Sequence, residues 1–351
     1  MHNLFHLHER VTVAVALTTL AVAAATMVWP AAGAHTPRTA AAVLPGHVDL
    51  PPDIVGAVTT VRRTAVRVAP DEDSTIVSKL RTGILVPVSG AKDGAYRVLT
   101  PCHVDGWVRA SDVTPHPVRG DGPPVIVLDA GHGGAQQPGA VGVRGLPEKD
   151  VNLDVVRRTQ TLLAGPRLDP IRIFVTRSQD HIAGLGFRSH LANALDADAL
   201  ISIHHNAAPD GPSEVPGTET YYQLRSKDSK RLAGLLYEEL LGTLRQIEAP
   251  WVSDNDAGAK YRANRRGTDF YSVLRETRVP SVIVEALYLS NPPEEVLLRD
   301  ERVRQAIADS VHRGVVRFLE TDAPGSGFVK PKPQSDAGPR GRLPANCVDP
   351  V

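Results

Sequence analysis

The most constraining feature of this sequence is a regular alternation, from Pro123 onward, of short apolar runs and longer amphipathic stretches. Runs typical of β-strands occupy residues 123–131, 171–177, 199–204, 218–224 and 281–286. Helical periodicity occupies residues 151–165, with Asp150 as a candidate N-cap, and residues 226–247 and 293–319. Strands that alternate with helices over residues 123–320 predict an α/β domain in which helices cover both faces of the sheet.

A different pattern precedes this domain. At about 150 residues per domain, a chain of 351 residues has room for two domains. Between residues 57 and 115, strand-type runs at 64–69, 84–89, 95–100 and 106–111 are separated by turn clusters, which predicts a small β-barrel or sandwich. The sequences VRVAP (66–70), KLRTG (79–83) and DGWV (105–108) resemble a bacterial SH3 domain. That resemblance implies binding to cell-wall peptides, and the alternative is a structural spacer without a ligand.

The N-terminus has the pattern of a targeting signal. An uncharged run extends from Val11 to Trp29, Pro30 interrupts it, and Ala32-Gly33-Ala34 matches the small-x-small pattern of signal peptidase sites. We expect export, with residues 1–34 acting as a cleaved signal peptide or as a membrane anchor retained through residues 11–29. A buried helix of the folded domain is the third alternative. Either form of export locates the rest of the chain outside the cytoplasmic membrane, as a secreted, cell-wall or periplasmic protein.

Two further segments lack periodicity. Residues 35–56 are rich in Ala and Pro and are predicted to be a linker. Residues 321–351 are dense in Pro, Gly and charge, and we expect a disordered tail there. The polar segment 249–267 is expected to be a loop beside the functional site.

Charge and cysteine content exclude several classes of function. Lys and Arg together number 39, as do Asp and Glu, so the net charge is zero and bulk charge does not favour a nucleic-acid partner. Two cysteines cannot form a four-thiolate zinc site, and any metal must be held mainly by His and carboxylates. Export would permit a disulfide between Cys102 and Cys347, and two unpaired thiols are the equal alternative.

Chemically distinctive residues gather where predicted strands end. They are the segments DAGHGG (129–134) and SIHHN (202–206), and Glu285 at the end of an apolar strand, while Glu148 lies just ahead of a helix. Functional groups of open α/β sheets lie outside the carboxyl ends of the strands. Two imidazoles and a carboxylate form a plausible catalytic zinc site, and a second carboxylate can act as its acid/base. The alternative is a bare glycine turn with a salt-bridged core acid.

The order of these motifs resembles the zinc-dependent N-acetylmuramoyl-L-alanine amidases of bacterial cell walls, the Amidase_3 family. The resemblance spans about residues 123–320 and implies a mixed sheet that is covered by helices on both faces. Its blocks are DAGHGG (129–134), PGA (138–140), GLPEKDVNL (145–153), Thr176-Arg177, Arg188, Ala192-Asn193, ADA (197–199), SIHHN (202–206), VLR (273–275), PSVIVE (280–285) and LSN (289–291).

The resemblance implies a role for each matching residue. His132, Glu148 and His204 would hold one Zn²⁺, and Glu285 would be the catalytic acid/base. The substrate would be peptidoglycan, cleaved at the amide that joins N-acetylmuramic acid to the L-Ala of the stem peptide. The sequence does not identify an activator protein.

Three other residues are weaker candidates for substrate binding. His205 stands where the family has a small residue, and successive strand residues point to opposite faces, so we expect a rim or supporting position, most simply facing solvent. Asn206 is expected to stabilise the turn and secondarily to contact substrate. Arg275 could bind a stem-peptide carboxylate, although a structural ion pair is the favoured alternative.

Two other functions are compatible with the same fold. One is a catalytically inactive wall-binding or regulatory protein, which would typically lack a ligand or the acid. The other is a zinc peptidase that cuts within the stem peptide, whose site chemistry would be nearly identical.

Overall fold

The computed structural model describes residues 55–166, 169–208, 217–247, 257–335 and 343–351. The N-terminal run at 11–29 and residues 35–54 of the predicted linker lie outside these ranges, and the last two residues of the predicted linker (55–56) belong to a strand. Within them, no helix is both long and apolar enough to cross a bilayer.

The first part of the described chain is an all-β unit, here called the β-domain (residues 55–117). Its seven strands pair antiparallel in the order β3-β2-β6-β5-β4-β1-β7. Alternate side chains are buried in Thr64–Arg67 and Asp105–Arg109, because successive residues of a strand point to opposite faces. The strands are β1 (Val55–Thr60), β2 (Thr64–Arg67), β3 (Ile76–Leu80), β4 (Leu85–Lys92), β5 (Ala95–Leu99), β6 (Asp105–Arg109) and β7 (Val113–Pro117), with the 3-10 turn η1 (Ala110–Asp112) before β7.

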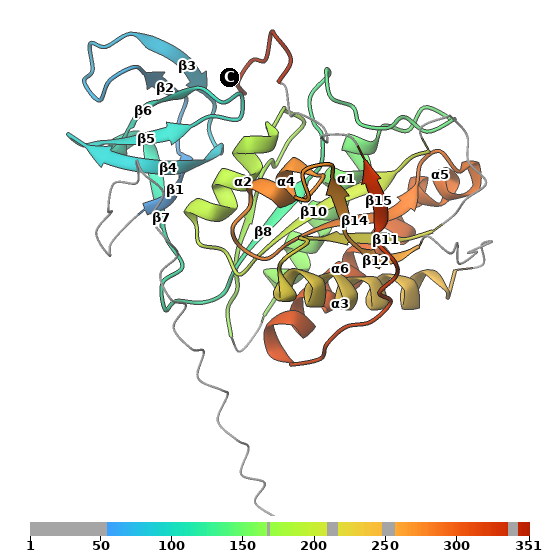
Figure 1. The fold of residues 1–351 in the computed structure, drawn as a ribbon. Coiled ribbons are helices and arrows are strands. Elements are labelled where there is room, and N and C mark those ends of the chain that lie inside the picture. Colours follow the sequence, from blue (N-terminus) through green and yellow to red (C-terminus); the bar gives the residue numbers. More distant parts are fainter. Residues whose placement is uncertain (1–54, 167–168, 209–216, 248–256, 336–342) are drawn as a thin grey trace, which may run out of the picture. The chain divides into compact units, whose positions relative to one another are not determined.

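The second part contains a six-stranded mixed sheet in the order β12-β11-β14-β10-β8-β9 (Figure 1). Neighbouring strands are parallel except for the antiparallel pair β11 and β14. The strands are β8 (Val125–Ala130), β9 (Arg172–Val175), β10 (Ala199–Asn206), β11 (Glu219–Tyr222), β12 (Gly258–Lys260) and β14 (Ser281–Tyr288).

Helices cover both faces of this sheet, as the alternating pattern predicts. Residues of α1, α3 and α6 share one hydrophobic cluster with the sheet, and residues of α2 and α4 share another on the opposite face (Figure 1). The helices are α1 (Glu148–Leu163), α2 (Leu185–Ala194), α3 (Lys227–Leu244), α4 (Ser272–Glu276), α5 (Pro292–Arg299) and α6 (Glu301–Glu320). The predicted α/β class with a mixed sheet is therefore confirmed.

Two helix predictions are wrong in detail. Helix α1 begins at Glu148 after Pro147, so Asp150 lies in its first turn and is not the N-cap. The expected single helix over 293–319 is two helices, because the Asp300 side chain accepts a hydrogen bond from the Arg302 N–H and starts α6 afresh.

The expected loop at 249–267 and the expected disordered tail at 321–351 also differ from the structure. Beyond residue 256, the first segment contains β12 and the short strand β13 (Arg262–Asn264). Strand β15 (Lys332–Ser335) pairs parallel with β13, so part of the tail belongs to a sheet. Cys102 and Cys347 form a disulfide, which decides between the two alternatives left by the sequence.

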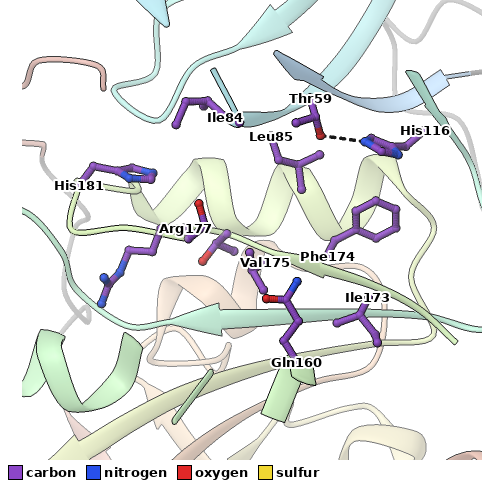
Figure 2. A pocket seen from close by; sticks show the side chains of 13 residues that line it. Thr59, Ile84, Leu85, His116, Gln160, Ile173, Phe174, Val175, Arg177 and His181 are labelled. Carbon is purple, nitrogen blue, oxygen red and sulfur yellow. Dashed lines mark hydrogen bonds between the residues drawn. The ribbon is translucent and has the colours of Figure 1, made fainter. Parts of the chain in front are cut away.

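The β-domain packs directly against α2 and β9. A cavity of about 220 Å³ lies there, lined by Leu85 and Ile84 of the β-domain and by Phe174 and Val175 of β9 (Figure 2). At its edge, Thr59 Oγ1 and His116 Nε2 lie 2.8 Å apart. None of the predicted metal ligands lines this cavity, so it is distinct from the site described next.

Candidate metal centre

The three predicted ligand residues lie together although they come from three separate elements. His132 follows β8, Glu148 is the first residue of α1, and His204 lies near the end of β10. One donor atom from each lies within 4.8 Å of the others. Glu148 links them, with Oε2 3.0 Å from His132 Nε2 and Oε1 2.7 Å from His204 Nδ1.

Glycines leave the space in which these side chains meet. A Cβ on Gly131 would lie 2.2 Å from His204 Nε2, and one on Gly139 would lie 2.4 Å from Glu148 Oε2. His132 itself has φ of 60°, the left-handed conformation that turns the chain back after β8. The cradle is therefore kept clear for two imidazole nitrogens and a carboxylate oxygen, a donor set that fits Zn²⁺ with one position left for water or substrate.

Two buried arginines brace the turn that carries His132. Arg188 donates to the carbonyls of Ala130 and His132, each at 2.8 Å. Arg177 donates to the carbonyls of Ala130 at 2.9 Å and Gly131 at 3.0 Å. Burial lowers the pKa of Arg177 to about 10, which still leaves it charged at neutral pH. These charge-assisted hydrogen bonds fix the backbone from which His132 projects.

Beneath the turn, the carboxylate of Asp129 interacts with three donor side chains. Thr176 Oγ1 and Ser202 Oγ each lie 2.5 Å from its carboxylate, and Arg188 pairs with it. Burial alone would raise the pKa of Asp129, but Arg188 and the two hydroxyls lower it below its usual value. The carboxylate therefore stays ionised and ties β8 to β10 directly below the cluster.

The three clustered residues also set one another's protonation. Burial favours neutral Glu148, yet the hydrogen bonds from His132 and His204 outweigh burial and hold its pKa well below the usual value. Burial lowers the pKa of His132, whereas the Glu148 hydrogen bond overcomes burial at His204 and raises its pKa. An ionised carboxylate is the form that a metal requires of a ligand.

Glu285 lies beside this cluster on β14. The parallel register of β10 and β14 pairs His204 with Glu285. The charge of Glu285 also contributes to the raised pKa of His204. The structure thus brings an acid that is not one of the three clustered donors next to them, as the sequence predicts for the acid/base.

Glu219 is a residue that the sequence analysis missed. It is 1% exposed and lies opposite Glu285 in the antiparallel register of β11 and β14. Its carboxylate accepts hydrogen bonds from Lys260 Nζ at 2.8 Å, Tyr221 Oη at 2.6 Å, Tyr288 Oη at 3.1 Å and Asn206 Nδ2 at 3.1 Å. The available signal was a lone acid inside an otherwise uncharged strand at 218–224.

His205 is not at the solvent-facing position favoured from the sequence. It is 1% exposed, and its Nδ1–H donates to Asn152 Oδ1 at 2.8 Å. Asn152 Nδ2 in turn donates to Glu148 Oε1 at 3.2 Å, and the His205 backbone N–H reaches the same oxygen. Burial lowers the pKa of His205 to about 4, so the ring is neutral. His205 supports Glu148 from behind.

The other two weaker candidates make local contacts. Asn206 Oδ1 accepts from the Ala207 N–H at 2.8 Å, which fits its expected role in the turn. Arg275 Nη1 donates to the carbonyls of Asp269 and Phe270, at 2.8 and 2.9 Å. Arg275 Nη2 also lies 3.8 Å from Glu276 Oε1, an ion pair of the kind that the structural alternative expects, and the substrate role of Arg275 stays a prediction.

Comparisons with known proteins identify the family to which the chain belongs. The family model Amidase_3, described as N-acetylmuramoyl-L-alanine amidase, matches residues 126–317. The amidase AmiC of Neisseria meningitidis is 30% identical over 244 residues, covering 60% of this chain and 57% of the relative. A probable cell wall amidase, LytH of Staphylococcus epidermidis, is 25% identical over 286 residues, covering 78% of this chain and 88% of the relative.

A solved structure is also similar. Cwp6 from Clostridium difficile matches with a TM-score of 0.50 and 26% identity, covering 57% of this chain and 30% of that one. This chain thus spans little more than half of the Neisseria relative and less than a third of Cwp6. Because the family model matches more than half of the sequence and includes the three predicted metal ligands and the predicted acid/base, the chain belongs to the Amidase_3 family of N-acetylmuramoyl-L-alanine amidases.

Proposed function

We propose that this protein is an exported zinc hydrolase of peptidoglycan that cleaves the amide between N-acetylmuramic acid and L-alanine. The observation that carries the proposal is the convergence of His132, Glu148 and His204 within 4.8 Å, with Glu285 paired in register to His204. An inactive relative would typically lack one of these four groups.

His132, Glu148 and His204 would hold the zinc ion. When bound, zinc supplies Lewis-acid polarisation of the scissile carbonyl and favours ionisation of the attacking water. Glu285 accepts the proton that this water loses as its oxygen bonds to the carbonyl carbon. The same carboxyl then donates the proton to the departing nitrogen as the C–N bond breaks, which yields the lactyl carboxylic acid and a peptide with a free amino group.

Two further features of the chain support export. The uncharged run at 11–29 followed by Ala32-Gly33-Ala34 is typical of an export signal. The disulfide between Cys102 and Cys347 is of a kind that persists in oxidising compartments. We propose that the β-domain is SH3-like and contributes to wall binding outside the cytoplasmic membrane.

The test is digestion of purified peptidoglycan by the purified protein, with zinc removed by a chelator and then restored. Mass spectrometry of the released fragments is expected to find free stem peptides that begin at L-Ala, only with zinc present. Glu285→Gln should abolish release without loss of zinc. The exposed Glu301, whose side chain is 78% accessible, gives the matched control Glu301→Gln, which should retain full release.

Other outcomes separate the alternatives. Fragments cut inside the stem peptide would identify a peptidase. Zinc binding without any release would favour a wall-binding or regulatory protein, and absence of zinc binding would contradict the proposed site itself.

A further inference from the structure

Residues 343–351, here called the latch segment, lie against the β-domain. Cys347 is joined to Cys102 by the disulfide. Two residues further on, the carboxylate of Asp349 accepts hydrogen bonds from the Cys102 N–H at 2.8 Å and from Ser78 Oγ at 2.6 Å. The Pro350 carbonyl accepts from the Arg81 N–H at 2.8 Å. The β-domain thus contacts this segment through a covalent bond and through three directed hydrogen bonds.

These contacts form a carboxylate-binding site. Asp349 is only 5% exposed, and a carboxylate removed from water is tolerated only when hydrogen bonds compensate its lost hydration. The donors come from β3 and from the turn between β5 and β6, so the folded β-domain positions them. Hydrogen bonds to a charged acceptor are roughly twice as strong as neutral ones. The backbone N–H of Arg81 also binds the carbonyl of Pro350, the residue after Asp349.

The latch segment also contacts the loop that carries His132. Asn346 Oδ1 accepts from Gln136 Nε2 at 2.8 Å, four residues after His132. On the other side of the disulfide, His103 Nε2 accepts from the Phe187 N–H at 3.0 Å, in the first turn of α2. The segment is therefore in contact with the β-domain and with the loop that carries His132.

We propose that the β-domain carries a binding site for an extended peptide with an aspartate-type carboxylate, that the chain's own latch segment occupies this site, and that the Cys102–Cys347 disulfide locks it there. Reduction releases the lock. A dithiol reductant supplies two electrons, the S–S bond breaks, each sulfur gains a proton, and the reductant becomes a disulfide.

The disulfide decides whether another peptide can compete. While the bond is intact, Asp349 is held beside its donors at a very high effective concentration, so a peptide in solution is excluded. After reduction, only the non-covalent contacts of Asp349 and Pro350 hold the segment. The proposal concerns the β-domain alone and does not depend on the hydrolysis proposed above.

The first test measures peptide binding to the full-length protein by fluorescence anisotropy. The host carries Cys347→Ser and Asp349→Asn, so that its own segment can no longer hold the site. The probe is a labelled peptide of residues 343–351 with Cys347→Ser, and its matched control has Asp349→Asn in addition. We expect the aspartate probe to bind this host at least tenfold more tightly than the asparagine probe.

Two further hosts complete this test. Oxidised wild-type protein should bind neither peptide, and Cys347→Ser alone should bind the aspartate probe weakly because its own Asp349 competes. Equal binding of both probes, no binding to the double variant, or binding to the oxidised wild type would each overturn the proposal.

Hydrogen exchange gives a second readout that does not need a peptide in solution. The Cys102 amide should exchange slowly in the oxidised wild type and at least tenfold faster in Asp349→Asn under reducing conditions. The amide of Val98, in the centre of β5, should stay protected and so report that the β-domain is still folded. If the Cys102 amide exchanges equally slowly in the oxidised wild type and in reduced Asp349→Asn, the assigned site is contradicted. This result does not depend on the outcome of the peptide test.

Discussion

At the scale of single residues, the proposed metal centre depends on side chains that are not among its three donors. Asn152 donates to Glu148 and accepts from His205, so the neutral imidazole keeps the Asn152 amide aimed at the ligand carboxylate. Partners behind metal ligands commonly change affinity 10- to 100-fold when removed. The geometry therefore makes His205 a positioning residue.

We predict that His205→Ala weakens zinc binding by about 10- to 100-fold, because Asn152 loses its donor and Glu148 its support. Deleting the buried ring should also lower the free energy of unfolding by about 2–4 kcal/mol. Chelator competition measures the first effect and thermal unfolding in the metal-free state measures the second.

The control for this variant is His190→Ala. His190 lies on α2, is exposed, and bonds only within its own helix, to the Gly186 carbonyl among the described contacts. The interpretation fails if the two alanine variants bind zinc equally well.

The residues of the centre could be predicted to different degrees. The proximity of His132, Glu148 and His204 was predictable because two of them follow predicted strands and all three stand in the order of the family's motifs. The burial of His205 and the hydrogen bonds of Glu219 were not predictable, because each depends on partners that are distant in sequence. The Asn152 partner of His205 comes from helix α1, and the Lys260 partner of Glu219 from a strand 41 residues away.

At the scale of elements, the first turn of α5 contains a buried glutamate that accepts hydrogen bonds from two separate backbone segments. Glu294 is 2% exposed and accepts from the Tyr288 N–H at 2.6 Å and the Gly217 N–H at 3.0 Å. Burial raises its pKa to about 7 even though both backbone hydrogen bonds lower it. The start of α5 is therefore sensitive to pH in a range where most carboxylates have already ionised.

The sign of this effect follows from linkage. Between the usual pKa of 4.5 and the folded value of about 7, the folded protein retains a proton that the unfolded chain has released. The contribution of protonated Glu294 to the free energy of unfolding is fully present below pH 4.5. It decreases by up to about 3 kcal/mol as the pH rises toward 7. We predict that Glu294→Gln flattens the decline of the melting temperature across this window.

The neighbouring Glu295 provides the control. It too is buried, and burial would raise its pKa, but the Arg144 and Leu146 N–H groups and Arg299 lower it instead. The contribution of ionised Glu295 to the free energy of unfolding is lost only as the pH falls below the usual pKa range of a glutamate. Glu295→Gln should therefore leave the slope of melting temperature against pH unchanged between pH 4.5 and 7. A wild-type slope that persists in Glu294→Gln would assign the pH dependence to another group.

Most elements of the α/β domain followed from periodicity, and the exceptions have physical causes. The break between α5 and α6 depends on the Asp300 cap, which interrupts a continuous amphipathic pattern that predicts one helix. Strands β13 and β15 have little apolar pattern of their own, and they form because they pair with each other across the chain. Local sequence does not encode such pairing.

At the scale of the whole molecule, the two predicted domains share hydrophobic core. Phe187 of α2 is fully buried within the cluster formed by the β-domain. In the other direction, Ala57 of β1 belongs to the cluster on the α2 face of the sheet, and Leu85 packs against it. The sequence suggested two separate units because each has its own strand pattern, whereas these contacts join residues that no local pattern connects.

Shared core predicts shared unfolding. The oxidised protein should give a single calorimetric transition whose van't Hoff and calorimetric enthalpies agree, since neither part can lose its contacts without exposing the other. Phe187→Ala should lower the free energy of unfolding by about 3–5 kcal/mol and shift that transition as a whole.

The matched substitution is Phe328→Ala, at a residue that is 39% exposed. It should lower the free energy of unfolding distinctly less than Phe187→Ala does. Reduction of Cys102–Cys347, which closes a span of 245 residues, should lower the melting temperature without splitting the transition. Two separate transitions in the oxidised protein, or a Phe187→Ala shift confined to one of them, would mean that the β-domain folds independently. A single transition that moves with Phe187 means instead that the fold of the metal centre and the fold of the β-domain are thermodynamically one.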